Sequence, residues 1–142
     1  MELTKFGALV QFALELEQGA AAFYNEAEKQ AGGDSLKAVF SSLLSDCRKN
    51  AQRLERIRRE DVNEMLLESV HGIHGETYSM PEVSAAGTGG LVAAAKVTEE
   101  TLARYYRDIV SKLSLPDAAR SFSRLADSHA RNEARVADLA PQ

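Results

Sequence analysis

The sequence predicts an all-α protein, a four-helix bundle of two repeated helical hairpins joined by a long crossover. The first observation is an internal repeat: residues 2–60 align without gaps with residues 84–142, and 12 of the 59 pairs are identical. The second is that apolar residues recur every three or four positions in both halves, which is the period of an amphipathic helix. The third is a Gly-rich linker, residues 71–90, between the halves.

Each half contains two helical segments and a short turn. In the first half an inner stripe from Leu9 to Ala27 defines one helix, and Gly-Gly-Asp at 32–34 separates it from the next. The second half has Ser-Leu-Pro-Asp at 114–117 as its turn, where a proline in the first helical turn loses no hydrogen bond. The expected helices lie near residues 5–30, 34–70, 88–113 and 116–139.

The linker is longer than the two to eight residues that usually connect helices in a bundle. Twenty extended residues reach about 66 Å, whereas a helix of about 25 residues is roughly 38 Å long. The linker can therefore cross the whole bundle, and the second helix then runs parallel to the third. On this plan residues 1–142 form one domain, with hairpin one at about 2–70, the crossover at about 71–90 and hairpin two at about 88–142.

The first helix of each hairpin carries a glutamate on the apolar stripe that is expected to be buried. Glu17 and Glu99 are equivalent in the repeat, and each precedes a tyrosine by seven residues. Burying an unpaired carboxylate costs several kcal/mol, so each needs a metal ion, an arginine or a proton of its own. The inward positions at the same level of the second helices are Cys47, Asn50, His129 and Asn132.

The order of these residues resembles the rubrerythrin branch of the ferritin-like superfamily. The resemblance rests on "ELEQGAAAFY" (15–24), on "VTEETLARYY" (97–106), and on a Phe-x-x-Leu in each second helix followed by a polar pair. It implies a ferritin-like bundle whose first helices each supply one Glu and whose second helices each supply a Glu-x-x-His to two irons. By position, Glu17 and Glu99 match the first-helix ligands.

The chain departs from this pattern where the family has Glu-x-x-His. One half has Cys47-x-x-Asn50 and the other has His129-x-x-Asn132, so both bridging carboxylates and both histidine ligands are replaced. Two irons normally need about six ligands with bridging carboxylates. The resemblance therefore implies a degenerate di-iron site.

Four strong donors remain, and they could form one mixed metal site. The expected ligands are Glu17, Cys47, Glu99 and His129, and a thiolate with an imidazole favours iron or zinc. The expected cofactor is thus one iron or zinc ion, or none. Around this set we expect hydrogen bonds from Asn50 and Asn132 to the buried carboxylates or to Tyr24 and Tyr106, and tyrosine hydroxyls that need the two glutamates as acceptors.

Each of these residues also has a purely structural interpretation. The glutamates could pair with Arg48, Arg53, Arg131 or Arg135. Cys47 could be a small buried apolar side chain, and His129 a core histidine that is hydrogen-bonded to a glutamate.

Three functions remain open. The first is a rubrerythrin-related protein with a remodelled core that binds at most one metal ion and is not a peroxidase. The second is a metal-free helical module for assembly or partner binding. The third is a di-iron oxidoreductase that recruits Glu15 and Glu133, although each lies one position off the inner stripe.

The composition of the chain argues against two classes of partner, nucleic acids and membranes. The formal net charge of −4 argues against nucleic acid, and "RLERIRRE" (53–60) alternates cations with Glu and apolar residues, as in a solvated helix face. The absence of a signal peptide, of an apolar run of about 18 residues and of a second cysteine predicts a cytoplasmic protein without a membrane partner.

A homodimer is the expected assembly. The segment "DVNEMLLESV" (61–70) extends the second helix beyond the repeat and offers Met65, Leu66 and Val70, which have no assigned partner within the bundle. Such an apolar extension is expected to pack against the linker or a second chain.

Overall fold

The computed structural model describes residues 1–65, 70–81, 87–114 and 116–139. Four long α-helices form the bundle, and one short 3-10 helix lies in the crossover. Their bounds are α1 Phe6–Gln30, α2 Asp34–Met65, η1 Gly75–Tyr78, α3 Gly87–Val110 and α4 Pro116–Ala137. The all-α prediction is confirmed: the helices follow the expected segments, and the described residues contain no strand, although Glu2 and His74 form an isolated bridge.

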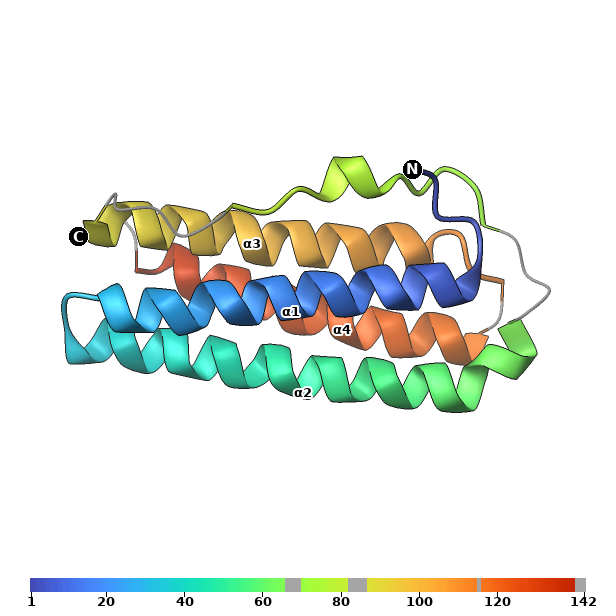
Figure 1. The fold of residues 1–142 in the computed structure, drawn as a ribbon, viewed down its shortest axis with the longest axis horizontal. Helices are drawn as coiled ribbons and strands as arrows, with labels where there is room; N and C mark the ends of the chain where they lie inside the picture. The colour runs from blue at the N-terminus through green and yellow to red at the C-terminus, as the bar shows by residue number, and fades with distance from the viewer. Residues whose placement is uncertain (66–69, 82–86, 115, 140–142) are drawn as a thin grey trace.

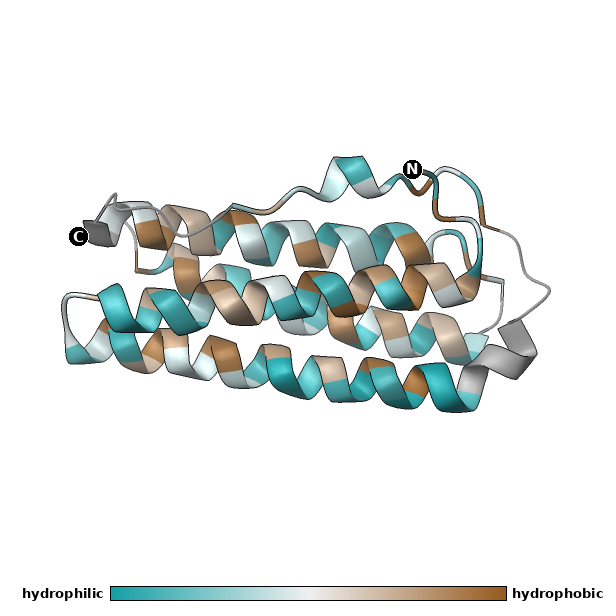
Figure 2. Cartoon of the chain, in the orientation of Figure 1, coloured by the Kyte–Doolittle hydropathy of each residue, from teal (hydrophilic) through white to brown (hydrophobic). Residues whose placement is uncertain are grey.

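The two hairpins lie side by side and are connected as predicted (Figure 1). Helix α1 packs closely on α2 and α3 packs closely on α4, whereas the contacts between hairpins are fewer. The chain returns along the bundle after α2, so α2 and α3 run in the same direction. Apolar and polar stretches alternate along each helix in Figure 2, as expected for helices that each bury one face.

The crossover is tied to the N-terminal residues. The Leu3 N–H donates to the Ile73 carbonyl at 2.7 Å, and the Val70 N–H donates to the Thr4 carbonyl at 3.0 Å. Gly72 has a φ of +91°, which only glycine adopts readily, and its N–H donates to the Glu2 carboxylate at 2.8 Å. These bonds fix the start of the crossover against the end of the bundle where α1 begins.

One of the apolar residues assigned to a dimer contact is used inside the chain. Val70 is only 2% exposed and belongs to the core cluster of the chain itself, so no second chain is needed to bury it. The side chains of Met65 and Leu66 lie outside the part of the structure that is described. The homodimer stays a prediction.

The seam between α1 and α3 is covered by the crossover and filled with aromatic rings. Tyr78 of η1 lies 4.9 Å from Tyr105 of α3, and Phe12 of α1 lies 5.3 Å from Tyr105, measured between ring centroids. Gly75 passes so close to Phe12 that a Cβ at this position would lie 3.1 Å from the ring. The crossover therefore seals this side of the bundle.

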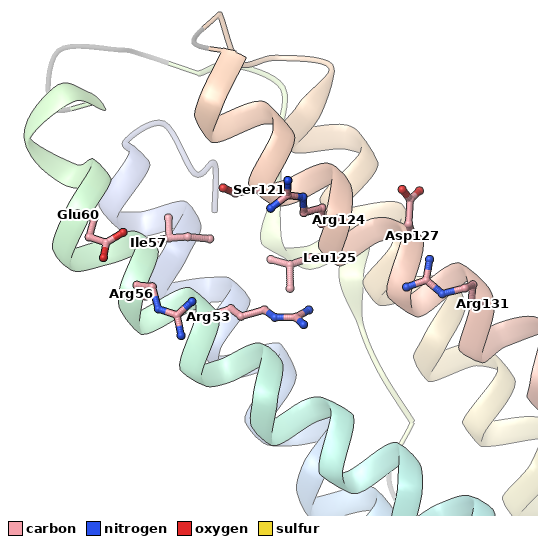
Figure 3. Close-up of a pocket in the computed structure, with 9 residues that line it drawn as sticks. All are labelled: Arg53, Arg56, Ile57, Glu60, Ser121, Arg124, Leu125, Asp127 and Arg131. Atoms are coloured by element: carbon pink, nitrogen blue, oxygen red, sulfur yellow. The ribbon is translucent and has the colours of Figure 1, made fainter.

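The seam between α2 and α4 holds two hollows, of about 480 and 390 Å³. Figure 3 shows the residues that line the larger one. Arg53 and Arg131 line both of them, and we call the two together the arginine groove. The described cationic residues that line it are Lys49, Arg53, Arg56, Arg124, Arg131 and Arg135. The described acidic residues that line it are Asp46, Glu60 and Asp127.

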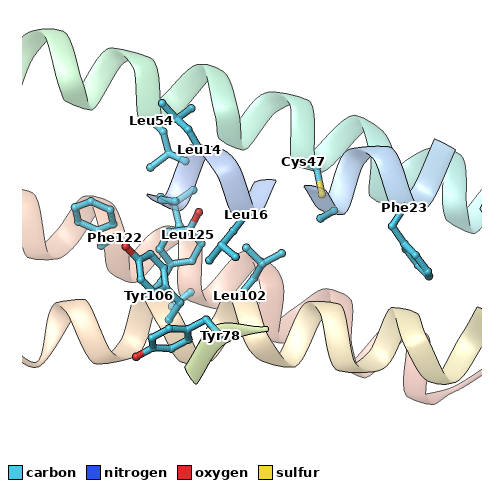
Figure 4. Packing of buried hydrophobic residues seen from close by; sticks show 14 of the residues in the cluster. Leu14, Leu16, Phe23, Cys47, Leu54, Tyr78, Leu102, Tyr106, Phe122 and Leu125 are labelled. Atoms are coloured by element: carbon cyan, nitrogen blue, oxygen red, sulfur yellow. The ribbon is translucent and has the colours of Figure 1, made fainter. Parts of the chain in front are cut away.

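The interior between the seams is a continuous apolar core (Figure 4). Phe122 and Tyr106 stack with ring centroids 6.1 Å apart, and Tyr24 stacks on Phe40 at the same distance in the other hairpin. These two stacks are related by the repeat, as are the positions of Cys47 and His129. No helix among the described residues is long and apolar enough to cross a membrane.

Candidate functional site

Each of the four long helices contributes one of the predicted donor residues. Glu17 comes from α1, Cys47 from α2, Glu99 from α3 and His129 from α4, and all four residues are at most 1% exposed. The three-and-four periodicity turns these positions toward the bundle axis. The structure therefore brings together in the core a set that the sequence could only place on inward faces.

The imidazole of His129 lies between the two carboxylates. Its Nδ1 is 2.7 Å from Glu99 Oε1, and its Nε2 is 2.8 Å from Glu17 Oε2. The ring also stacks on Tyr106, with an angle of 15° between the ring planes. Both nitrogens can donate to carboxylates only when the imidazole is protonated, so this geometry corresponds to an imidazolium between two anions.

The electrostatics support the protonated form. Burial acts to lower the pKa of His129, but the charge of Glu17 and hydrogen bonds to Glu17 and Glu99 outweigh burial and raise the pKa to about 10. A histidine with this pKa carries a proton at neutral pH. The side chain therefore supplies the positive charge that two buried carboxylates require.

The two tyrosines complete the carboxylate contacts across the hairpins. Tyr24 donates to Glu99 Oε2 at 2.5 Å, and Tyr106 donates to Glu17 Oε2 at 2.6 Å. The predicted use of the glutamates as tyrosine acceptors is thus confirmed. Burial first, and the neighbouring carboxylates next, raise the pKa of both hydroxyls well above its usual value, so they remain donors.

Cys47 adds a neutral group to this cluster. Burial, followed by the charges of Glu17 and Glu99, raises the pKa of its thiol well above the ordinary value. A thiol that keeps its proton is a poor metal ligand and an unreactive side chain.

One carboxylate oxygen of the site has no hydrogen-bond partner in the part of the chain that the structure describes. Glu17 Oε1 is buried and has no hydrogen-bond partner among the described residues, so it is the least satisfied atom of the site.

The two asparagines differ from expectation. Neither is hydrogen-bonded to a buried glutamate or a tyrosine hydroxyl among the described residues: Asn50 Nδ2 lies 3.2 Å from His129 Nε2, and Asn132 donates to Asp46 at 3.2 Å. A protonated Nε2 is a donor and cannot accept a hydrogen bond from the Asn50 NH₂ group. The Asn50 side chain must therefore turn its amide oxygen toward the imidazole ring. That orientation gives up the long 3.4 Å contact from Arg53 to Asn50.

The arginines do not neutralise the buried glutamates. Arg48, Arg53, Arg131 and Arg135 are all exposed. Sequence reasoning missed that Arg135 belongs to a network at the rim of the arginine groove, where it contacts Asn132 at 3.2 Å and Ser42 at 3.2 Å. The spacing of Asn132 and Arg135, three residues apart on one helix, is the signal that could have identified this pair.

The residues present do not fit a pair of irons. Both nitrogens of His129 are engaged by carboxylates, asparagines (Asn50 and Asn132) stand where the resemblance implied histidine ligands, and Glu15 is exposed. No group of three or more His, Cys, Asp and Glu side chains in residues 1–65, 70–81, 87–114 and 116–139 is arranged so that it could hold a metal ion. The arrangement instead forms a closed ionic and hydrogen-bonded network.

Comparison with known proteins agrees with this architecture. No curated protein is significantly similar to the chain. A family model described as "Ferritin-like domain" matches residues 7–142, which is nearly the whole sequence. The match spans both hairpins and the crossover that joins them, so the chain belongs to the ferritin-like domain family.

Proposed function

We propose that this ferritin-like protein is a rubrerythrin-related chain that works without a core metal ion, as a helical binding module and not as an oxidoreductase. One observation carries the proposal: the two ring nitrogens of His129 lie 2.7 and 2.8 Å from the carboxylates that would otherwise bind metal. An imidazolium in this position balances the charge that an ion would balance. The remodelled site then stabilises the bundle.

The competing possibility is one iron or zinc ion held by Glu17, Cys47, Glu99 and His129. Binding such an ion would require His129 to lose its proton and at least one carboxylate contact, and Cys47 to ionise in a site that raises its thiol pKa. Each of these steps opposes metal binding. The same ligand count argues against a di-iron enzyme that recruits Glu15 or Glu133, because Glu15 is exposed and Glu133 is only half-buried.

Metal analysis of untagged protein tests the proposal. After growth with added iron and zinc, we expect less than about a tenth of an equivalent of either metal, because the network offers no free donor set. Imidazole ¹⁵N chemical shifts should show both nitrogens of His129 protonated at neutral pH.

Two variants sharpen the result. If the core is metal-free, Glu17→Gln keeps the side-chain shape and removes one of two buried negative charges, so it should change stability little. About one equivalent of iron or zinc, lost in both Glu17→Gln and His129→Ala, would overturn the proposal in favour of a single-ion site.

A further inference from the structure

The arginine groove gathers cationic side chains from two helices on a chain whose formal net charge is −4. Six cationic and three acidic side chains line it among the described residues. Two cationic pairs are related by the repeat: Lys49 with Arg131, and Arg53 with Arg135. The duplicated hairpin has therefore placed equivalent cations on both walls of one groove.

Three of these arginines have no acidic partner in the part of the chain that the structure describes. Among the described residues, Arg56, Arg124 and Arg131 form no hydrogen bond or ion pair, whereas Arg58 and Arg120 each pair with an acid three residues earlier on their own helix. Arg53 also pairs with no acidic side chain in the described part of the chain, and its guanidinium lies 3.4 Å from the amide of Asn50. The groove thus presents several sets of planar N–H donors at close quarters, which is the arrangement that suits phosphate oxygens.

The groove also has an apolar floor. Ile57 of α2 and Leu125 of α4 line the larger hollow and lie between the arginines that come from the two helices (Figure 3). Its volume of about 480 Å³ is within the range of small-molecule sites, which combine an apolar lining with a few well-placed polar groups. A long polyanion fits less well, because Glu60 and Asp127 interrupt the positive surface.

We propose that the arginine groove binds a small organic phosphate that carries at least two phosphate groups. Arg53 and Arg131, which line both hollows, hold the phosphates, and the organic part lies against Ile57 and Leu125. This assignment deepens the proposed binding function by naming a ligand class, and it uses none of the buried residues that decide the metal question. No covalent step is involved.

Titration calorimetry with inorganic pyrophosphate at low salt tests the groove. We expect saturable one-site binding that weakens as salt is added. Arg53→Ala and Arg131→Ala should each weaken binding about tenfold, because each removes charge-assisted hydrogen bonds to phosphate. Arg58→Ala is the matched control, since it removes the same charge from the exposed face of α2 outside the groove and should leave affinity within about twofold.

Several results would overturn the assignment. Absence of saturable binding at about 1 mM pyrophosphate, or equal losses in Arg53→Ala, Arg131→Ala and Arg58→Ala, would remove the groove as a phosphate site. Binding of an oligoglutamate peptide or single-stranded RNA without pyrophosphate binding would assign it to a macromolecule. ADP should bind more tightly than pyrophosphate, and equal affinity would refute the role of Ile57 and Leu125. Circular dichroism checks that each variant is folded.

The experiments test the metal-free core and the phosphate-binding groove independently of each other. Metal in the core with intact pyrophosphate binding would refute only the metal-free function. A metal-free core with no phosphate binding would refute only the ligand class.

Discussion

The seam between α1 and α3 and the seam between α2 and α4 join the same two hairpins, but they are filled differently. The first is covered by the crossover and packed with Phe12, Tyr78 and Tyr105. The second holds the arginine groove, where exposed guanidinium groups face one another across a hollow of about 480 Å³. A bundle with one crossover can cover one such seam with its own chain and leaves the other to solvent or to a ligand.

This difference suggests that one seam stabilises the fold and the other binds a ligand. Apolar rings removed from water stabilise the covered seam, because each buried aromatic side chain contributes both area and packing. Exposed arginines contribute little to folding, since their charges are solvated. We therefore expect substitutions in the α1/α3 seam to change the free energy of unfolding and substitutions in the arginine groove to change ligand affinity.

The largest expected effect comes from the covered seam. Tyr105 is fully buried, contacts the Tyr78 and Phe12 rings and donates to the Leu9 carbonyl at 2.7 Å. Tyr105→Ala should lower the free energy of unfolding in urea by about 3–5 kcal/mol, because it leaves a cavity beneath the crossover. Tyr105→Phe keeps the ring and should cost only about 1 kcal/mol. Similar losses for the two variants would show that the hydroxyl bond to Leu9, and not the packing of the ring, stabilises this seam.

A second prediction concerns the network between the seams. The pKa of His129 is raised from 6.5 to about 10 on folding, so its stabilising contribution is complete below pH 6.5 and is lost as the pH rises toward 10. The carboxylates that face it come from α1 and α3, and the nearby thiol comes from α2. Between pH 7 and 8.5 the free energy of unfolding should fall by about 1 kcal/mol per pH unit.

The control for this slope is His129→Gln, which has no titrating proton. The variant should be less stable at pH 7, because two carboxylates then face a neutral amide, and its stability should not fall over the same pH range. Burial raises the pKa of Cys47 and of Tyr24, so their contributions are also lost with rising pH, but only above about pH 9. A wild-type slope that persists in the variant would contradict the assignment to His129.

The sequence predicted the elements that repeat and could not predict the distances between them. Helical periodicity placed Glu17, Glu99 and the tyrosines on inward faces, and the length of the linker indicated a crossover that makes α2 and α3 parallel. Periodicity shows which face of a helix a residue occupies, but it does not give the distance to a side chain on another helix. Whether His129 would share a metal with the carboxylates or hydrogen-bond to both therefore depended on contacts that only the packed bundle defines.

The arginine groove was hidden for the same reason. Residues 53–60 have the pattern of a solvated helix face, and their arginines are indeed exposed. The groove exists because α2 and α4 remain far enough apart for a hollow to form between them, and because Arg124 and Arg131 lie on the opposite wall. A charge pattern along one helix carries no information about the helix that faces it.

The smallest expected effect lies in the open seam. Arg56 and Arg124 face the same hollow without an acidic partner among the described residues, so the double variant Arg56→Ala, Arg124→Ala should change the free energy of unfolding by less than about 0.5 kcal/mol. At low salt the variant should be slightly more stable than the wild type, because it relieves repulsion between like charges, and added salt should remove this difference in stability.

Saturating pyrophosphate should make the wild type the more stable of the two, since a ligand that binds the folded wild type stabilises it and the variant lacks part of the site. Urea unfolding at two salt concentrations, with and without pyrophosphate, measures all of these differences. A large loss of stability without ligand would mean that the arginines hold α2 and α4 together, and the contrast between the two seams would then fail.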